Sequence, residues 1–364
     1  MRGEPSKQAT MLSLASPEQR VPATHPLREI KKLADAALAK MSPVFDAMYA
    51  VDGRPSIPPE SLLKATLLMA FYSIRSERLF CEQLDYNLMF RWFLNMNMLE
   101  DSFEHSVFSK NRERLLKHEA SKVFFAEVVG QAREAQLMSD DHFTVDGTLI
   151  EAWASLKSFK RKGEKDDRSD KDDPGNPSVD FHGEKRSNDT HESTTDPEAR
   201  LARKGKGKES KLAYSGHALM ENRHGLLVDL RIDEANGTAE RNLALQMLME
   251  ALPGDRSTTV AGDKGYDTAD FVHACRALNI VPHVAQNISG NRGSAIDGRT
   301  TRHSGYAISQ RIRKRVEEIF GWLKTIACFR KTRFKGKDRT QFAGYMVGAA
   351  YNLLRIAKLR LAAA

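Results

Sequence analysis

Apolar residues recur three and four positions apart through most of the first third of the chain, a spacing typical of packed helices. Residues 27–41 form the first such segment, after a leading tail without this spacing. Beyond a proline-rich turn, the pattern predicts helices over 60–73, 76–93, 106–117 and 120–135. We therefore expect a tail and leading helix in residues 1–45 and an all-α N-terminal domain in residues 46–137.

The pattern changes near residue 141, where apolar and β-branched residues begin to alternate with polar ones. This alternation predicts a strand over 142–150 and a hairpin formed by 212–221 and 225–232. Further along, the spacing predicts helices over 239–252, 269–278, 307–325 and 341–361, with strands over 258–263 and 280–284. Strand, hairpin, helix, strand, helix, strand, helix is the order of a ribonuclease H-like domain. The expected fold class is α/β, with a mixed sheet flanked by helices in residues 138–364.

Residues 155–211 interrupt this order directly after the first strand. They contain 15 basic and 13 acidic residues and show no apolar period. Such a composition buries too little apolar surface to offset the entropy of ordering the chain. We expect a polar, flexible insertion rather than a domain.

Length and composition narrow the class of protein. A chain of 364 residues with 41% hydrophobic residues is long enough for two domains with real cores. The longest apolar run, residues 62–71, is too short to span a membrane, and the N-terminus lacks the pattern of a signal peptide. Three widely spaced cysteines argue against a zinc module or a disulfide framework and suit a reducing cytoplasm.

The charge of the chain points to a polyanionic partner. The formal net charge is +8, and residues 299–339 hold 13 basic residues against only three acidic ones. Basic residues outnumber acidic ones too strongly here for a surface of paired charges, although a solvated helix face remains the alternative. Neutralisation of nucleic-acid phosphates accounts for it better.

Two aspartates of the predicted sheet are candidate ligands of a cation. Asp146 lies inside an otherwise apolar strand, where an unpaired carboxylate is costly unless it binds something positive. Its alternative role is that of a turn residue in a Val-Asp-Gly-Thr stretch. Asp263 is the last residue of the strand predicted over 258–263, and this position at the strand end favours it over Asp267, four residues further on.

A third carboxylate is expected from the helix over 307–325, which carries adjacent Glu317 and Glu318. Arg313 and Lys324 share a helix face with Glu317, whereas Glu318 projects about 100° away. The alternative is an ordinary surface ion pair between residues four apart. Three carboxylates suffice for two Mg²⁺ ions about 3.5–4 Å apart, which is the arrangement used for phosphodiester transfer. Mn²⁺ is expected to substitute for Mg²⁺.

The helix over 106–117 has basic residues on its polar side, Lys110 and Arg112 among them. This arrangement resembles the recognition helix of a helix-turn-helix protein. An ordinary basic surface helix is the alternative.

Several stretches of the chain are similar to bacterial insertion-sequence transposases, specifically to the insertion-sequence-five family. In the N-terminal half they are Gly-Arg-Pro-Ser-Ile-Pro-Pro-Glu, Ser-Ile-Arg-Ser-Glu-Arg, Gln-Leu-Asp-Tyr-Asn-Leu and His-Ser-Val-Phe-Ser-Lys-Asn-Arg. Later come Val-Asp-Gly-Thr, Gly-Asp-Lys-Gly-Tyr-Asp and Arg-Ile-Arg-Lys-Arg-Val-Glu-Glu-Ile-Phe-Gly-Trp-Leu-Lys-Thr. The resemblance spans about residues 20–360.

This resemblance implies a DDE transposase whose catalytic and metal-binding residues are Asp146, Asp263 and Glu317. The family signature places a tyrosine, an arginine, a glutamate and a lysine at fixed spacing. Arg313, Glu317 and Lys324 fit this spacing, which favours Glu317 over Glu318, but Gln310 stands at the tyrosine position. Arg313 and Lys324 would hold DNA phosphates.

The family also implies the partners and the reaction. Such an enzyme binds the terminal inverted repeats of its element in double-stranded DNA, cuts both ends and joins them to target DNA, as a homodimer or larger assembly on the DNA. This activity places it at the nucleoid of the bacterial cytoplasm. Further DNA contacts are expected from the C-terminal basic residues Arg330, Lys331 and Arg333 and from the N-terminal residues Lys110 and Arg112.

Two other functions remain as alternatives. A decayed transposase could act as a DNA-binding regulator, but the three intact carboxylates count against it. A metal-dependent nuclease of another kind would explain the carboxylates but not the helical N-terminal region. Inverted repeats flanking the gene would separate the transposase from both.

The end of the insertion carries basic residues spaced by glycines: Arg200, Arg203, Lys204, Lys206, Lys208 and Lys211. They precede the second strand and so lie near the expected carboxylates. One hypothesis is that this segment orders over DNA phosphates. The alternative is a tolerated surface insertion without a role.

Overall fold

The computed structural model describes most of the chain: residues 17–49, 56–97, 100–163, 186–205, 207–237, 239–252, 254, 256–288 and 293–363. The leading tail before residue 17, the first part of the turn before residue 56, the middle of the insertion and Lys206 lie outside the described residues.

A six-stranded mixed sheet forms the centre of the C-terminal part. Its strands are β1 (His142–Glu151), β4 (Arg200–Ala202), β5 (Lys211–Glu221), β6 (Leu226–Glu234), β7 (Thr258–Gly262) and β8 (Ile280–Val284). β1 pairs antiparallel with β5 and parallel with β7; β6 continues from β5, and β8 from β7. The order β6-β5-β1-β7-β8 is that of a ribonuclease H-like sheet, so the predicted fold class is confirmed.

Helices cover both faces of the sheet because each face carries its own set of apolar residues. On one face Phe143 and Val145 of β1 pack with Met247 of α9 (Ala239–Ala251) and Phe271 of α10 (Ala269–Ala277). The other face packs against α14 (Lys337–Ala363), as Ile150 of β1 illustrates. Alternate residues of β1 thus enter different cores, as the period of two requires.

The N-terminal part is helical, as predicted. Its helices are α1 (Pro17–Arg20), α2 (Leu27–Lys40), α3 (Ser42–Asp46), α4 (Pro59–Phe71), α5 (Glu77–Tyr86), α6 (Leu88–Phe93), α7 (His105–Lys117) and α8 (Ala120–Glu134). The single helix expected over 76–93 is wrong, because Asn87 divides it. The Asn87 side chain accepts the backbone N–H groups of Met89 and Phe90 and so caps α6 as a new helix.

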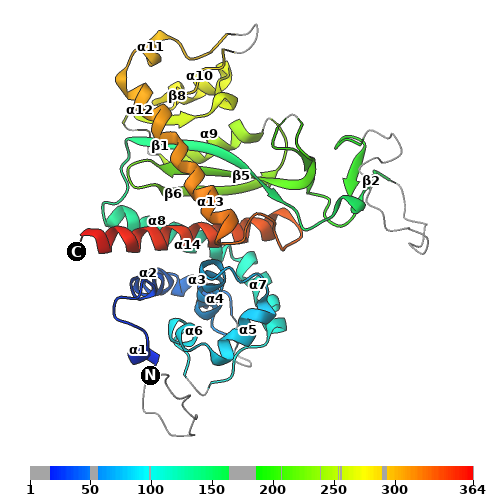
Figure 1. Cartoon of the computed structure of the whole chain (residues 1–364), viewed down its shortest axis with the longest axis vertical. Coiled ribbons are helices and arrows are strands. Elements are labelled where there is room, and N and C mark those ends of the chain that lie inside the picture. The colour runs from blue at the N-terminus through cyan, green and yellow to red at the C-terminus, as the bar shows by residue number, and fades with distance from the viewer. Residues whose placement is uncertain are drawn as a thin grey trace, which may run out of the picture.

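The long helix α14 joins the two parts. It lies between the sheet and the N-terminal helices, and it packs against α8 and β6 (Figure 1). Phe125 of α8, Met346 of α14 and Leu230 of β6 belong to one continuous hydrophobic core. Among the helices of the described ranges, none is both long enough and apolar enough to cross a membrane.

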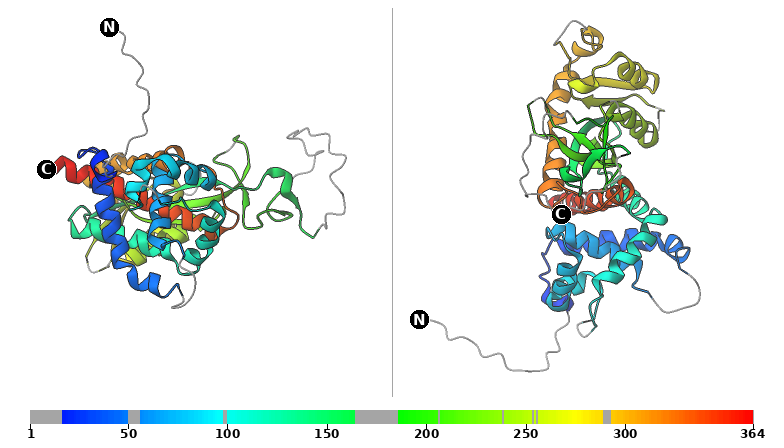
Figure 2. Two further views of the ribbon diagram at one scale, coloured as in Figure 1. Left: turned by 90° about the horizontal axis from the view of Figure 1, so that it is seen from below. Right: turned by 90° about the vertical axis from the view of Figure 1, so that its right-hand side faces the viewer.

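The described ends of the insertion contain regular structure, which corrects the expectation of a segment without it. Residues Leu156–Ser158 form the 3-10 turn η1, β2 (Phe159–Arg161) pairs with β3 (His191–Ser193), and β4 adds to the main sheet. This β2–β3 arm projects from one side of the sheet (Figures 1 and 2). A few contacts order it: the buried Phe159 ring stacks on His191 with ring centroids 5.6 Å apart.

The expected helix over 307–325 is divided as well. The chain forms α11 (Gly298–Thr301), α12 (Ser304–Ile312), the 3-10 turn η4 (Arg313–Arg315) and α13 (Val316–Thr325). A guanidinium NH₂ group of Arg315 donates to the backbone carbonyl of Asn222, 2.9 Å away, which ties η4 to the β5–β6 turn. The tighter turn therefore coincides with a contact to the β5–β6 turn of the sheet.

Candidate active site

A cleft of about 1240 Å³ opens beside the middle of β1. Six of the residues predicted as metal ligands or DNA contacts line it: Asp146, Asp263, Arg313, Glu317, Lys324 and Arg330. They come from β1, the end of β7, the α12–α13 segment and the loop before α14. Segments more than 100 residues apart in the chain therefore meet in one hollow.

Sheet register brings the two aspartates together. β1 and β7 run parallel, and their last pair is Thr144 opposite Ala261, so Asp146 and Asp263 each lie two residues beyond it. Neighbouring strands are about 4.8 Å apart, so these carboxylates are close neighbours. Burial raises the pKa of Asp146 to about 7, and the negative charges of Asp263 and Glu240 add to this rise. The backbone N–H of Gly147 and the positive charge of Arg313 oppose it.

Asp263 and its alternative, Asp267, have different surroundings. The exposed Asp263 caps the 3-10 turn η3 (Lys264–Tyr266), where its Oδ1 accepts the backbone N–H of Gly265 at 2.7 Å. Asp267 is buried and accepts the backbone N–H groups of Asn287 and Ala295 at 2.6 and 2.9 Å. The second aspartate thus organises a loop and is absent from the cleft lining.

The late helix presents Glu317, and not Glu318, to the cleft. Arg313, Glu317 and Lys324 line it together with Phe320 and Gly321. Four and seven residues correspond to about one and two helical turns, so the shared face persists although η4 interrupts the helix. Glu318, on another face, lies close enough to Tyr351 of α14 to contribute to the rise in the pKa of that phenol, which burial mainly causes.

Gln310, at the position of the signature tyrosine, bridges the sheet and the cleft. Its side-chain NH₂ donates to the backbone carbonyl of His283 in β8 at 2.6 Å. Its side-chain oxygen accepts from Nε of Arg313 at 3.0 Å. Since the first bond orients the amide, the oxygen faces Arg313 and holds that guanidinium in the cleft.

Glu240, in the first turn of α9, was missed from the sequence but lines the same cleft. It accepts a hydrogen bond from the hydroxyl of Tyr266 at 3.2 Å, and it lies against Gly147, where a Cβ atom would collide with it. Burial raises the pKa of Glu240, and Asp263 adds to the rise. The one signal in the sequence was the glycine directly after Asp146, which leaves room for a fourth carboxylate.

The acidic part of the cleft suits a hard divalent cation. Asp146, Glu240, Asp263 and Glu317 line it, and the exposed Asp189 of the insertion lines the cleft as a fifth acidic residue. Burial, together with neighbouring negative charges, raises the pKa values of Asp146 and Glu240, and a bound cation would favour their charged forms. Oxygen ligands of this kind are those Mg²⁺ and Mn²⁺ accept. Within the described residues no three acidic, histidine or cysteine side chains already form a compact ion-binding group.

Basic residues form the other side of the cleft. Lys324 donates from its ammonium group to the hydroxyl of Thr148, two residues beyond Asp146 on the same face of β1. Burial lowers the pKa of Lys324, and the positive charges of Lys204 and Arg330 lower it further. The backbone of Arg330 is fixed beside β1, since its carbonyl accepts the N–H of Glu151 at 2.9 Å.

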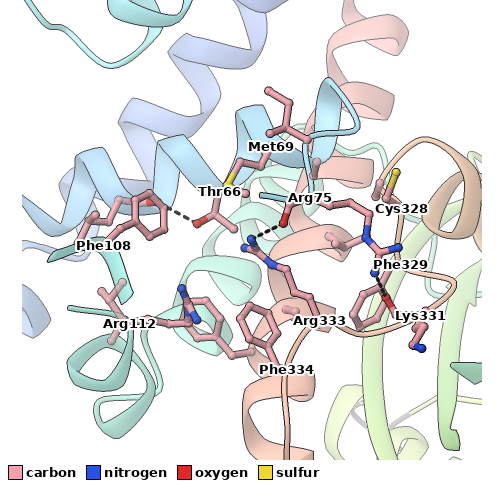
Figure 3. Close-up of a pocket in the computed structure, with 18 residues that line it drawn as sticks. Thr66, Met69, Arg75, Phe108, Arg112, Cys328, Phe329, Lys331, Arg333 and Phe334 are labelled. Atoms are coloured by element: carbon pink, nitrogen blue, oxygen red, sulfur yellow. Dashed lines mark hydrogen bonds between the residues drawn. The ribbon is translucent and has the colours of Figure 1, made fainter. Parts of the chain in front are cut away.

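Four other predicted DNA contacts lie outside this cleft. Arg112 of α7 and Arg333 both pair with Glu77 of α5 at a small cavity of about 70 Å³ between the N-terminal helices and the C-terminal part. Figure 3 shows Arg112 beside the ring of Phe334 and Arg333 directed at the backbone carbonyl of Arg75, which accepts at 2.8 Å. Both guanidiniums thus have partners within the protein.

The remaining two are Lys110 and Lys331. Lys110 is exposed on α7, away from the residues that line the cleft. Lys331 lines the small cavity, and its ammonium group lies 5.9 Å from the centre of the Trp153 ring.

Comparison with known families gives two matches. Residues 15–114 match the model described as "Transposase domain (DUF772)", and residues 178–353 match the one described as "Transposase DDE domain". Together they cover about three quarters of the chain. No curated protein matches it.

Several solved structures are similar at low identity. A piggyBac transposase synaptic complex with hairpin DNA is 10% identical, with 93% of this chain and 76% of that chain covered and a TM-score of 0.44. A pre-cleavage Mos1 transpososome is 10% identical over 84% and 82%, with a TM-score of 0.21. A mariner Mos1 paired-end complex with Mg is 11% identical over 94% and 98%, with a TM-score of 0.20. Scores this low carry no inference about individual residues.

Proposed function

The chain belongs to the DDE transposases of insertion-sequence type, and we propose that it binds the terminal inverted repeats of its own element, cuts the DNA at both ends and joins the 3′ ends to target DNA. Two ends must be held for joining, so the active form is a homodimer or larger assembly on DNA, located at the bacterial nucleoid. The family matches do not separate one group of insertion sequences from another, and membership of the insertion-sequence-five family stays a prediction.

One observation carries the proposal: a single cleft is lined by Asp146, Asp263 and Glu317 and also by basic residues. Carboxylates without basic residues would favour a simple cation site, and basic residues without carboxylates would favour a protein that only binds DNA. Their combination supports phosphoryl transfer on a DNA strand.

In this proposal each group has a defined task. Asp146, Asp263 and Glu317 hold two Mg²⁺ ions, or Mn²⁺ in their place. When bound, such ions activate the attacking oxygen and stabilise the leaving oxygen. Arg313 and Lys324 hold the phosphates of the strand, with Gln310 fixing the orientation of Arg313. Water is the first attacking group and the freed 3′-hydroxyl the second, so no serine or tyrosine nucleophile is required.

The test is cleavage of a labelled DNA fragment that carries the element's end, with Mg²⁺ or with EDTA. We expect Mg²⁺-dependent cutting at the end, joining of the 3′ end to added plasmid, and neither with the Asp146→Asn variant. Binding without cutting would indicate a regulator instead. Cutting without joining, at sites unrelated to the element's end, would indicate a different nuclease.

A further inference from the structure

The insertion after β1 contributes residues to the lining of the cleft. Lys162 follows β2, and Arg203 and Lys204 follow β4; all three line the cleft together with Lys324 and Arg330. The β4 strand is fixed in the main sheet through its pairing with the start of β5. The insertion therefore supplies a predominantly basic wall, with the exposed Asp189 as its acidic residue in the cleft lining, and pairing with the sheet fixes the strand directly before Arg203 and Lys204.

The charges on this wall lack anionic partners. Within the described ranges, no hydrogen bond or ion pair involves the side chains of Arg203 and Lys204, and both are exposed. Arg200, by contrast, points to Glu234 and forms an ion pair at 2.8 Å. Like charges gathered at Lys204, Lys324 and Arg330 repel one another, so the cluster is suited to an anion from outside the protein.

The distance of the Lys204, Lys324 and Arg330 cluster from Asp146 indicates which kind of anion it binds. Lys324 contacts Thr148, which lies about 7 Å along β1 from Asp146 because each residue of a strand advances about 3.4 Å. A phosphate held there lies beside the carboxylate site without occupying it. A chain of phosphates, such as a DNA strand, reaches both places at once.

We propose that Arg203 and Lys204 of the insertion, with Lys324 and Arg330, bind the backbone of the DNA strand whose scissile phosphate lies at the carboxylates. This inference rests on the proposed function, and it assigns the insertion as one wall of the DNA-binding cleft. Contacts to phosphate carry no base information, so the wall binds cognate and unrelated DNA alike.

The experiment measures the salt dependence of DNA binding by the full-length protein, with a fragment carrying the element's end and with unrelated DNA. Arg203→Ala and Lys204→Ala should each reduce the log–log slope by about 0.9 on both DNAs. The matched control is Lys208→Ala, which removes the same charge from an exposed position of the same segment outside the cleft lining. Its slope should equal that of the wild type.

Equal reductions of the log–log slope in Lys204→Ala and Lys208→Ala would overturn the inference, since only the overall charge of the protein would then matter. A slope change confined to the element's end would also overturn it, because base recognition would be involved. Melting temperatures should stay at the wild-type value for all three variants, as these side chains are exposed. Absence of Mg²⁺-dependent cutting by the wild type would refute the proposed function separately, because the binding slopes do not depend on cleavage.

Discussion

At the scale of single residues, burial and neighbouring negative charges set the protonation of the carboxylates at the site. Asp146 has a usual pKa near 3.8, which burial raises to about 7. The folded protein therefore binds this proton more tightly than the unfolded chain does. Between these two pH values folding takes up a proton, so the stability of the metal-free protein falls as the pH rises.

Asp146→Asn should remove this loss of stability at high pH, because the amide cannot become charged. In EDTA at pH 8, we expect the free energy of unfolding of the variant to exceed that of the wild type by about 2 kcal/mol. This is roughly half of what the full pKa shift would give, because Asp146 keeps some solvent contact. At pH 4 the gain should nearly vanish. Urea denaturation at both pH values measures it, with Asp85→Asn, an exposed aspartate of α5, as control. A gain independent of pH would contradict the explanation.

Glu317 and Glu318 provide a matched pair for testing the third carboxylate. Glu317→Gln should reduce cleavage of the element's end by more than about 100-fold, above the range usual for groups outside the metal shell. Its DNA binding should stay within about twofold of the wild type. Glu318→Gln, one residue away but outside the cleft lining, should keep most of the activity. The reverse outcome would assign the ligand to Glu318.

At the scale of elements, the α12–η4–α13 segment connects the edge of the sheet to the cleft. Gln310 spans from β8 to Arg313, which begins the 3-10 turn. The amide of Gln310 therefore links the position of the Arg313 guanidinium to the backbone of β8. An arginine held by one hydrogen bond at Nε keeps its outer NH₂ groups available for phosphate.

Gln310→Met, which has a similar size but lacks both polar groups, should weaken binding to DNA by about 10-fold, within the range typical for supporting residues. Because Gln310 acts through Arg313, the effect should disappear when Arg313→Ala is already present. Gel-shift titrations of the wild type, the two single variants and the double variant measure the coupling between Gln310 and Arg313 in DNA binding. Gln246→Met, at an exposed position of α9, is the control. Additive effects would show that Gln310 acts independently of Arg313.

At the scale of the whole molecule, the N-terminal helices and the sheet share one core around α14. A polar cluster adds to this interface: Glu77 of α5 receives both Arg112 of α7 and Arg333 of the C-terminal part. The Glu77 and Arg112 side chains are only 12% and 13% exposed. Removal of the Glu77 carboxylate would leave the guanidiniums of Arg112 and Arg333 without their anionic partner in a largely buried interface.

Glu77→Ala should therefore lower the free energy of unfolding by about 2–3 kcal/mol, somewhat less than removal of one partner from a fully buried pair. Glu82→Ala, at an exposed position of the same helix, should change it by less than about 0.5 kcal/mol. The salt dependence of DNA binding by Arg333→Ala provides a second measurement. A slope flattened by about 0.9 would support the phosphate contact predicted from the sequence, and an unchanged slope with lower stability would favour a structural role.

The sequence by itself determined the properties that depend on local spacing. The period of apolar residues predicted the main helices and the five strands β1, β5, β6, β7 and β8, and their order predicted the ribonuclease H-like sheet. The short helices α1, α3 and α11 and the strands β2–β4 were not predicted. The spacing of Arg313, Glu317 and Lys324 predicted a common face, because three fixed distances on a helix surface need no knowledge of the rest of the fold.

Only the tertiary structure decided which side chains meet. The position at a strand end favoured Asp263 over Asp267, but nothing local distinguishes Arg333 from Arg330 as a cleft residue, or Glu240 from any other acidic residue at a helix start. The parallel pairing of β1 with β7 brings Asp263 towards Asp146, helix α9 brings Glu240 to the same cleft, and Arg333 pairs with Glu77 of the N-terminal helices. The strands of the insertion also arise from pairing with distant partners. Such contacts depend on long-range pairing and burial, which periodicity along the chain does not encode.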